Sequence, residues 1–319
     1  MSAPDAAGDE VALTRRADRL RGLHGIDDGV DLTGLIGAPL QFELTRRALL
    51  EVTLVSLACG SLGVLVVLRG LAFIGDALGH CVVPGVVLAY LLHAPLEVWG
   101  GAAALVSAWL MALSARHARL SGDTSIAVVF TTMFGLGLAL ISATGSYFND
   151  LTEILFGNIL GVGATDLALS AACAAIVLGV LTVLFRPLVL VAFDPSAAAA
   201  LGLPRDRLDL LLYALLALAI VSGAVAAGSV LVTALLVVPA ATARLIARSV
   251  RGQMLLAAAF GCLAGWGGLY ASYYWRLASG GSIVLAAVLL FFVALFASST
   301  ASMIARLRPR QVVVKLAVA

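Results

Sequence analysis

Long apolar stretches, separated by short polar connections, run along this chain from about residue 49 to residue 304. Each stretch has roughly the length, about 20 residues, that a helix needs to cross the hydrocarbon core of a bilayer. The apolar residues are continuous instead of alternating with polar ones, which predicts membrane-spanning helices and not a β-barrel. Runs with few charges predict nine spans, at residues 49–68, 76–93, 97–115, 125–143, 167–185, 208–227, 229–247, 253–275 and 282–304. The sixth and seventh meet at Gly228 without a polar connection, so a count of eight stays open.

The composition agrees with a chain surrounded by lipid. Of the 319 residues, 62% are apolar and 12% are charged, and the mean hydropathy is +1.08. A soluble domain has about 25% charged residues, so a water-facing globular surface is excluded. We expect an all-α polytopic membrane protein with about 8–9 transmembrane helices. Its expected parts are a polar N-terminal extension (residues 1–44), a transmembrane domain (45–306) and a C-terminal tail (307–319).

The positions of the charged residues indicate which ends of the spans face the cytoplasm. The net charge is +2, and nearly all basic residues are arginines near the ends of the apolar stretches, so nucleic acid is not an expected partner. Arginines follow the odd-numbered stretches, for example Arg69, Arg116 and Arg244, and the positive-inside rule therefore places those ends in the cytoplasm. Arg276 follows the eighth stretch against this pattern. The arginines before the first stretch also conflict with nine spans, which would put the N-terminus outside.

Ionisable side chains inside a span are expensive and are therefore functional candidates. Asp76 and His80 are four residues apart, so a helix would place them on one face, where they could grip one ion. Oxygen and imidazole ligands without a thiolate suit Mn²⁺, Zn²⁺ or Fe²⁺. Pro84 cannot donate to the His80 carbonyl, which predicts a kink and a free oxygen beside the imidazole. Gly75 and Gly79 would let a second helix approach closely, which suits a site shared between two copies of the chain.

A structural role accounts for the same residues without a ligand. In that interpretation Asp76 caps the second span and His80 only packs. Glu51 stands four residues after Arg47 and is expected to snorkel with it toward the membrane surface. His93, at the end of a span, needs no special role. Four cysteines without metal-ligand spacing are interpreted as small buried residues: Cys59, Cys81, Cys173 and Cys262.

Two longer connections between spans stand out. Residues 145–166 carry Asp150 and Glu153 among aromatic residues and glycines, as an interfacial helix facing an extracellular partner would. Residues 186–209 contain Asp194 as an N-cap, Pro195 at the first helical position, a run of alanines and Gly202 as a stop. These signals predict a short cytoplasmic helix, which is either a docking element or a plain connector.

The chain contains no P-loop, GxSxG, HExxH or glycine-rich nucleotide motif. We therefore expect a protein that is not an enzyme, has no cofactor and takes any pumping energy from a partner.

Several separate motifs occur in the chain in order: FIGDALGHCVVPGVVLAYLL, GDTSIAVVFTTMFGLGLALIS, LFGNILGV, FDPSAAAALGLP and AAGSVLVTALLVVPAATARL. Together they resemble the membrane permease subunit of the manganese/zinc/iron class (ABC-3 family) of ATP-binding-cassette importers, over residues 38–305. The sequence departs from the family pattern at Cys81, where a small alanine-like residue is usual, and at Arg276, where an acidic residue is common. Cys81 follows His80 directly and would point about 100° off its face, so we do not include it among the ligands.

The resemblance implies a type II ABC importer-like permease in the bacterial plasma membrane. It further implies a homodimer or a pair with a related permease, a pair of cytoplasmic ATPase subunits, and an extracellular metal-binding solute receptor. By the same resemblance, Asp76 and His80 line the pathway and bind the metal in transit. The helix near residues 194–202 would couple to the ATPase through five residues: Asp194, Pro195, Ala199, Leu201 and Gly202.

From these expectations follows import of a divalent metal ion by alternating access, with Mn²⁺ as the first choice and Zn²⁺ or Fe²⁺ as alternatives. The alternative is a proton- or ion-coupled secondary metal transporter, in which Asp76 and His80 relay protons without an ATPase. A scaffold in which the pair only caps and packs is the third possibility.

Overall fold

The computed structural model describes residues 37, 39–116, 121–144 and 159–307. Within these ranges every regular element is a helix. The chain divides into two compact units, residues 1–43 and 44–319. The helices described below belong to the second unit, except for Glu43, the first residue of α3.

Nine spans in the described residues are long and apolar enough to cross a membrane, in agreement with the predicted count. One of them is the consecutive pair α4 and α5, and the other eight are single helices. Gly228, whose φ is 89°, separates the sixth span from the seventh, so the two apolar stretches that meet there are distinct helices. The helices that make up the spans are α3 (Glu43–Leu68), α4 (Ile74–Cys81), α5 (Val83–Leu91), α6 (Leu96–Ala115), α7 (Gly122–Thr144), α9 (Ala164–Val183), α12 (Arg205–Ala227), α13 (Ser229–Ile246), α14 (Val250–Trp275) and α15 (Ser279–Leu307).

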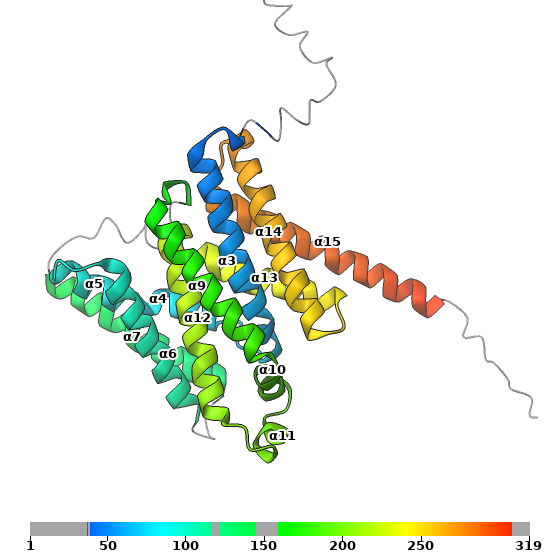
Figure 1. The fold of residues 1–319 in the computed structure, drawn as a ribbon, viewed down its shortest axis with the longest axis horizontal. Helices are drawn as coiled ribbons and strands as arrows, with labels where there is room; N and C mark the ends of the chain where they lie inside the picture. The colour runs from blue at the N-terminus through cyan, green and yellow to red at the C-terminus, as the bar shows by residue number, and fades with distance from the viewer. Residues whose placement is uncertain (1–36, 38, 117–120, 145–158, 308–319) are drawn as a thin grey trace, which may run out of the picture. The chain divides into compact units, whose positions relative to one another are not determined.

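The interior of the second unit is built around α3, α4, α12 and α13, whose apolar side chains form most of one continuous core. Helix α12 packs against α6, α9 and α13, while α13 also packs against α4, α14 and α15 (Figure 1). Helix α5 packs against α6 and α7. Many apolar side chains on α7, α9 and α15 stay exposed, because lipid tails solvate apolar side chains and no hydrophobic effect drives them inward.

Three short helices lie outside the spans. The 3₁₀ helix η1 (Ile159–Gly161) precedes α9. Helices α10 (Phe185–Phe193) and α11 (Pro195–Ala200) connect α9 to α12 and pack against each other and against α12 (Figure 1). We call residues 185–204, which comprise α10, α11 and the turn before α12, the coupling segment, after the role that the resemblance predicts for residues 194–202.

Candidate metal site and coupling segment

Asp76 and His80 lie in the first and last turns of α4. His80 Nδ1 is 3.6 Å from Asp76 Oδ1, so the two side chains share one face of the helix, as their spacing predicts. Both are partly enclosed, with exposed side-chain fractions of 42% for Asp76 and 22% for His80. The N-cap of α4 is Phe73, and no side chain caps it, so the expectation that Asp76 is the cap is wrong.

A hydrogen bond within α4 fixes the His80 imidazole. Its Nδ1 lies 2.9 Å from the backbone carbonyl oxygen of Asp76. Because a carbonyl oxygen only accepts, Nδ1 must be the donor, which leaves Nε2 of the neutral ring with a lone pair. Histidines that bind metals are commonly oriented by such a bond from the other ring nitrogen. His80 therefore has the arrangement of a metal ligand through Nε2.

Two phenylalanines of α7 pack edge-on against the imidazole of His80. The ring centroid of His80 lies 5.9 Å from that of Phe130 and 5.8 Å from that of Phe134, with interplanar angles of 90° and 77°. Phe73, which precedes α4, packs edge-on against Phe130 at 5.7 Å. The sequence alone does not single out these residues, because a phenylalanine in an apolar helix carries no signal of its partner. The four-residue spacing of Phe130 and Phe134, which puts both on one face of α7, is the only hint.

The small-residue face of α4 contacts α13 of the same chain. A Cβ atom on Gly75 would lie 2.9 Å from Cδ2 of Leu236, and one on Gly79 would lie 3.0 Å from Cβ of Ser229. The expectation that a second helix approaches closely is confirmed. These glycines do not serve contact with a second copy, because α13 of the same chain already covers this face, and a site shared between two copies stays a prediction.

The break between α4 and α5 differs from the expected proline kink in its position and in its hydrogen bonding. The helix is interrupted at Val82, two residues before Pro84. The N–H of Val82 donates to the carbonyl of His80, so the expectation of a free oxygen beside the imidazole is wrong. The metal ligands that α4 can offer are therefore the two side chains.

Glu51 does not snorkel to the membrane surface. The residue is fully buried, and its Oε1 accepts a 2.7 Å hydrogen bond from Ser170 Oγ of α9. The i,i+4 spacing to Arg47 suggested a surface pair, but α9 covers this side of α3. The expectation for Glu51 is therefore wrong, and its carboxyl group belongs to the contact between α3 and α9.

The coupling segment has the local structure that its sequence predicts. Asp194 is the N-cap of α11, and its Oδ1 accepts the N–H groups of Ser196 at 3.0 Å and Ala197 at 2.9 Å. Pro195 occupies the first helical position, and Gly202 follows the helix with a φ of 73°. The Ser196 hydroxyl and then the Ala197 N–H, both donating to the carboxylate, hold the pKa of Asp194 below its ordinary value. The capping form is therefore the charged form.

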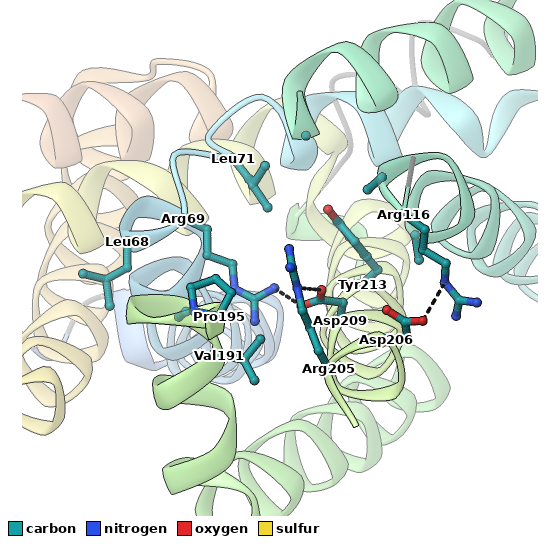
Figure 2. A pocket seen from close by; sticks show the side chains of 14 residues that line it. Leu68, Arg69, Leu71, Arg116, Val191, Pro195, Arg205, Asp206, Asp209 and Tyr213 are labelled. Carbon is teal, nitrogen blue, oxygen red and sulfur yellow. Dashed lines mark hydrogen bonds and ion pairs between the residues drawn. The ribbon is translucent and has the colours of Figure 1, made fainter. Parts of the chain in front are cut away.

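A cavity of about 500 Å³ opens where the coupling segment meets the ends of several spans (Figure 2). Arg69 from the end of α3, Arg116 from the end of α6 and Pro195 from α11 line it. Arg69 and Arg205 both point toward Asp209 of α12 in Figure 2. In sequence, Arg69 served only as a topology marker, because its partner is 140 residues away.

The other candidate residues offer no further ligand cluster. In the ranges that the structure describes, no three His, Cys, Asp or Glu residues gather closely enough to hold a metal ion. Three of the cysteines, including Cys81, are buried as expected, while Cys262 is partly exposed. His93 takes a left-handed conformation at the end of α5, with a φ of 49°. Asp150 and Glu153 lie outside the described residues.

The comparison with known proteins decides the family. The model of the ABC 3 transport family matches residues 41–298, which is more than half of the chain. The chain belongs to the ABC 3 transport family. This ABC 3 family member is a multi-pass membrane protein, since nine apolar spans lie in its described residues.

Named relatives of this ABC 3 family chain are transport proteins. It is 37% identical over 276 residues to the "Manganese transport system membrane protein MntC" of Halalkalibacterium halodurans, covering 86% of this chain and 94% of that protein. It is 35% identical over 257 residues to the "Probable iron transport system membrane protein" of Haemophilus influenzae, covering 81% and 94%. Among solved structures, "PsaBC from Streptococcus pneumoniae in complex with Fab" matches with a TM-score of 0.72 and 32% identity, over 82% of this chain and 95% of that chain.

Proposed function

We propose that this ABC 3 family chain is the permease of an importer for a divalent transition metal ion, and that Asp76 and His80 hold the ion in transit. The observation that carries this proposal is the oriented Asp76–His80 pair on α4, in a chain related to manganese transport proteins. Carboxylate oxygen and imidazole nitrogen suit Mn²⁺, and they also accept Zn²⁺ and Fe²⁺. The name of the Haemophilus relative keeps iron as an alternative cargo.

The pair is only part of a coordination shell. One chain supplies two ligands, and the described residues hold no third acidic, histidine or cysteine ligand near them. In a homodimer with two-fold symmetry, the same pair from a second copy would supply two more ligands. A related permease in place of the second copy is the alternative. A shell of few protein ligands also favours release, which conduction requires as much as capture.

We further propose that a pair of cytoplasmic ATPase subunits docks on the coupling segment and drives alternating access, and that a metal-binding receptor delivers the ion from outside. Phe193 and Leu201 of the coupling segment have exposed fractions of 61% and 71%. In a part of the chain between two spans, exposed apolar side chains favour contact with a partner protein. Ala199 and Gly202 are exposed on the same segment.

The alternative function is a proton- or ion-coupled secondary metal transporter. It predicts metal uptake without an ATPase, driven by an ion gradient. An ATPase that copurifies with the chain, and is lost when residues 194–202 are altered, would exclude this alternative.

The test is metal uptake into proteoliposomes that contain the full complex, with Mn²⁺, Zn²⁺ and Fe²⁺ compared for wild type and His80→Ala. We expect His80→Ala to abolish ATP-dependent uptake, while the complex still assembles and still hydrolyses ATP, because Nε2 of His80 is a direct ligand. The ion whose uptake is lost identifies the cargo. His93→Asn is the matched control, since asparagine tolerates the left-handed backbone at that position.

The expected control result is wild-type uptake by His93→Asn. Unchanged uptake by His80→Ala would contradict the proposed site. Uptake by the chain without any ATPase would contradict the proposed function itself.

A further inference from the structure

An enclosed ion pair joins the beginning of α12 to the end of α3. Arg69, directly after α3, donates from Nη1 to Oδ1 of Asp209. The two side chains have exposed fractions of 11% and 23%. Oδ2 of Asp209 lies 3.5 Å from Nε of Arg205, the first residue of α12. Asp209 therefore faces two arginines, Arg69 from the end of α3 and Arg205 from its own helix, as Figure 2 shows.

The connection from α3 to α4 is short and internally bonded. Residues 69–73 separate the two helices. Gly70 has a φ of 69°, and the N–H of Leu71 donates to the carbonyl of Val66 at 3.0 Å, which is the Schellman ending of a helix. The carbonyl of Leu71 then accepts the N–H of Ile74, the first residue of α4, also at 3.0 Å. The end of α3 is therefore linked to the start of α4, the helix of the Asp76–His80 pair, by two consecutive backbone hydrogen bonds.

The connection from α11 to α12 is also short and held by backbone hydrogen bonds. The N–H of Leu203 donates to the carbonyl of Ala198 at 3.1 Å, and the N–H of Arg205 donates to the carbonyl of Leu203 at 2.8 Å. Ala198 is fully buried. Helix α11 is therefore linked by backbone hydrogen bonds to the start of α12, whose first turns carry Asp209.

Burying the Arg69–Asp209 ion pair costs desolvation free energy, which its contribution to the stability of the fold alone does not explain. Nε and Nη2 of Arg69 are buried and have no hydrogen-bond partner in the part of the chain that the structure describes. Apolar side chains of similar volume often stabilise such a position as well as an ion pair does. Separating the pair, however, would leave an uncompensated charge, so the two helix ends resist being drawn apart. The adjacent cavity of about 500 Å³ leaves room for the joined ends to move together.

We propose that the Arg69–Asp209 ion pair, which Arg205 of the same helix as Asp209 supports, transmits movement of the coupling segment to the helix that holds the metal ion. Arg69 and Asp209 are thus positioning residues that act through α4. The inference rests on the proposed function, because it assumes an ATPase at the coupling segment and an ion at Asp76 and His80.

The test uses the reconstituted complex and compares wild type, Asp209→Asn, the charge-swapped double variant Arg69→Asp/Asp209→Arg, and the milder Arg205→Gln. Four quantities are measured: Mn²⁺ binding to the complex, the basal rate of ATP hydrolysis, Mn²⁺ transported per ATP hydrolysed, and the melting temperature. Arg116→Gln is the matched control, since Arg116 lines the same cavity but pairs with Asp206, at 3.7 Å.

For Asp209→Asn we expect unchanged Mn²⁺ binding and basal hydrolysis, with the Mn²⁺ transported per ATP reduced about tenfold, a size typical of coupling between sites. The charge swap should restore part of the transport per ATP, Arg205→Gln should reduce it less than Asp209→Asn, and Arg116→Gln should match wild type. Unchanged transport per ATP in Asp209→Asn would overturn the inference, as would joint loss of Mn²⁺ binding and melting temperature without rescue by the swap. Absence of ATP-dependent uptake by the wild-type complex would instead overturn the proposed function.

Discussion

The side chain of Glu51 is fully buried where α3 contacts α9. Ser170 donates to one of its oxygens, while Oε2 has no hydrogen-bond partner among the described residues. Within a bilayer no water can replace a lost partner, so a polar contact between helices contributes to their association. The hydroxyl of Ser170 is therefore expected to stabilise the contact between α3 and α9.

Replacing Ser170 by alanine should lower the free energy of unfolding by about 1 kcal/mol, within the range measured for hydrogen bonds between membrane helices. The measurement is reversible unfolding in mixed detergent micelles. Ser114→Ala is the control, because Ser114 donates to the carbonyl of Leu110 in its own helix and should change the unfolding free energy little. Equal effects of both substitutions would count against a role for the contact with Glu51.

At the scale of elements, the stability of α11 depends on its N-cap residue, Asp194. The hydrogen bonds to Asp194 lower the pKa of its carboxyl group, so the cap forms in the charged state. The stabilisation is fully present above the ordinary pKa of aspartate, and it is lost as the pH falls through the lowered pKa of the folded state. At neutral pH the cap is therefore complete.

Asp194→Ala should reduce the amount of ATPase that copurifies at pH 7 by several-fold, because α11 loses the acceptor for two N–H groups. Asp194→Asn should retain most of the ATPase, because the amide oxygen still accepts these bonds. Copurified ATPase is measured by quantitative blotting against the permease. Undiminished ATPase with Asp194→Ala would contradict a docking role for the capped helix.

The sequence predicts a helix where the residues of that helix themselves carry the signal. The spans follow from length and hydropathy, and α11 follows from Asp194, Pro195 and Gly202. Contacts between elements were not predictable in this way, because the partners of Glu51 and Gly79 depend on which helix packs there. For the same reason, sequence spacing identified the Asp76–His80 pair but not the phenylalanines around it.

At the scale of the whole chain, the ends of the first and third spans and the beginning of the sixth border one cavity. Arg244, at the end of the seventh span, donates to the carbonyl of Val67 at the end of the first, at 3.1 Å. These contacts gather arginine-bearing ends together, as the positive-inside pattern predicts. That pattern also predicts that this end, with the coupling segment, faces the cytoplasm.

A single cysteine introduced at Leu201, which is 71% exposed, should react with a membrane-impermeant maleimide in inverted vesicles and not in intact cells. A cysteine introduced at Leu277, between α14 and α15 and 50% exposed, should show the opposite accessibility. The wild-type chain, with its four native cysteines, measures the background. Labelling of both positions from the same side would contradict the predicted topology.

Burial of the Cys81 side chain has a consequence for toxic metals. Cys81 follows His80 in sequence but has no exposed surface, so its sulfur is shielded from an ion beside the imidazole. Copper(I) and cadmium gain most of their binding strength from sulfur, whereas manganese gains little. On the proposed path, a soft toxic ion therefore meets no sulfur ligand beside the Asp76–His80 pair, where it would otherwise bind tightly and block the passage of the transported ion.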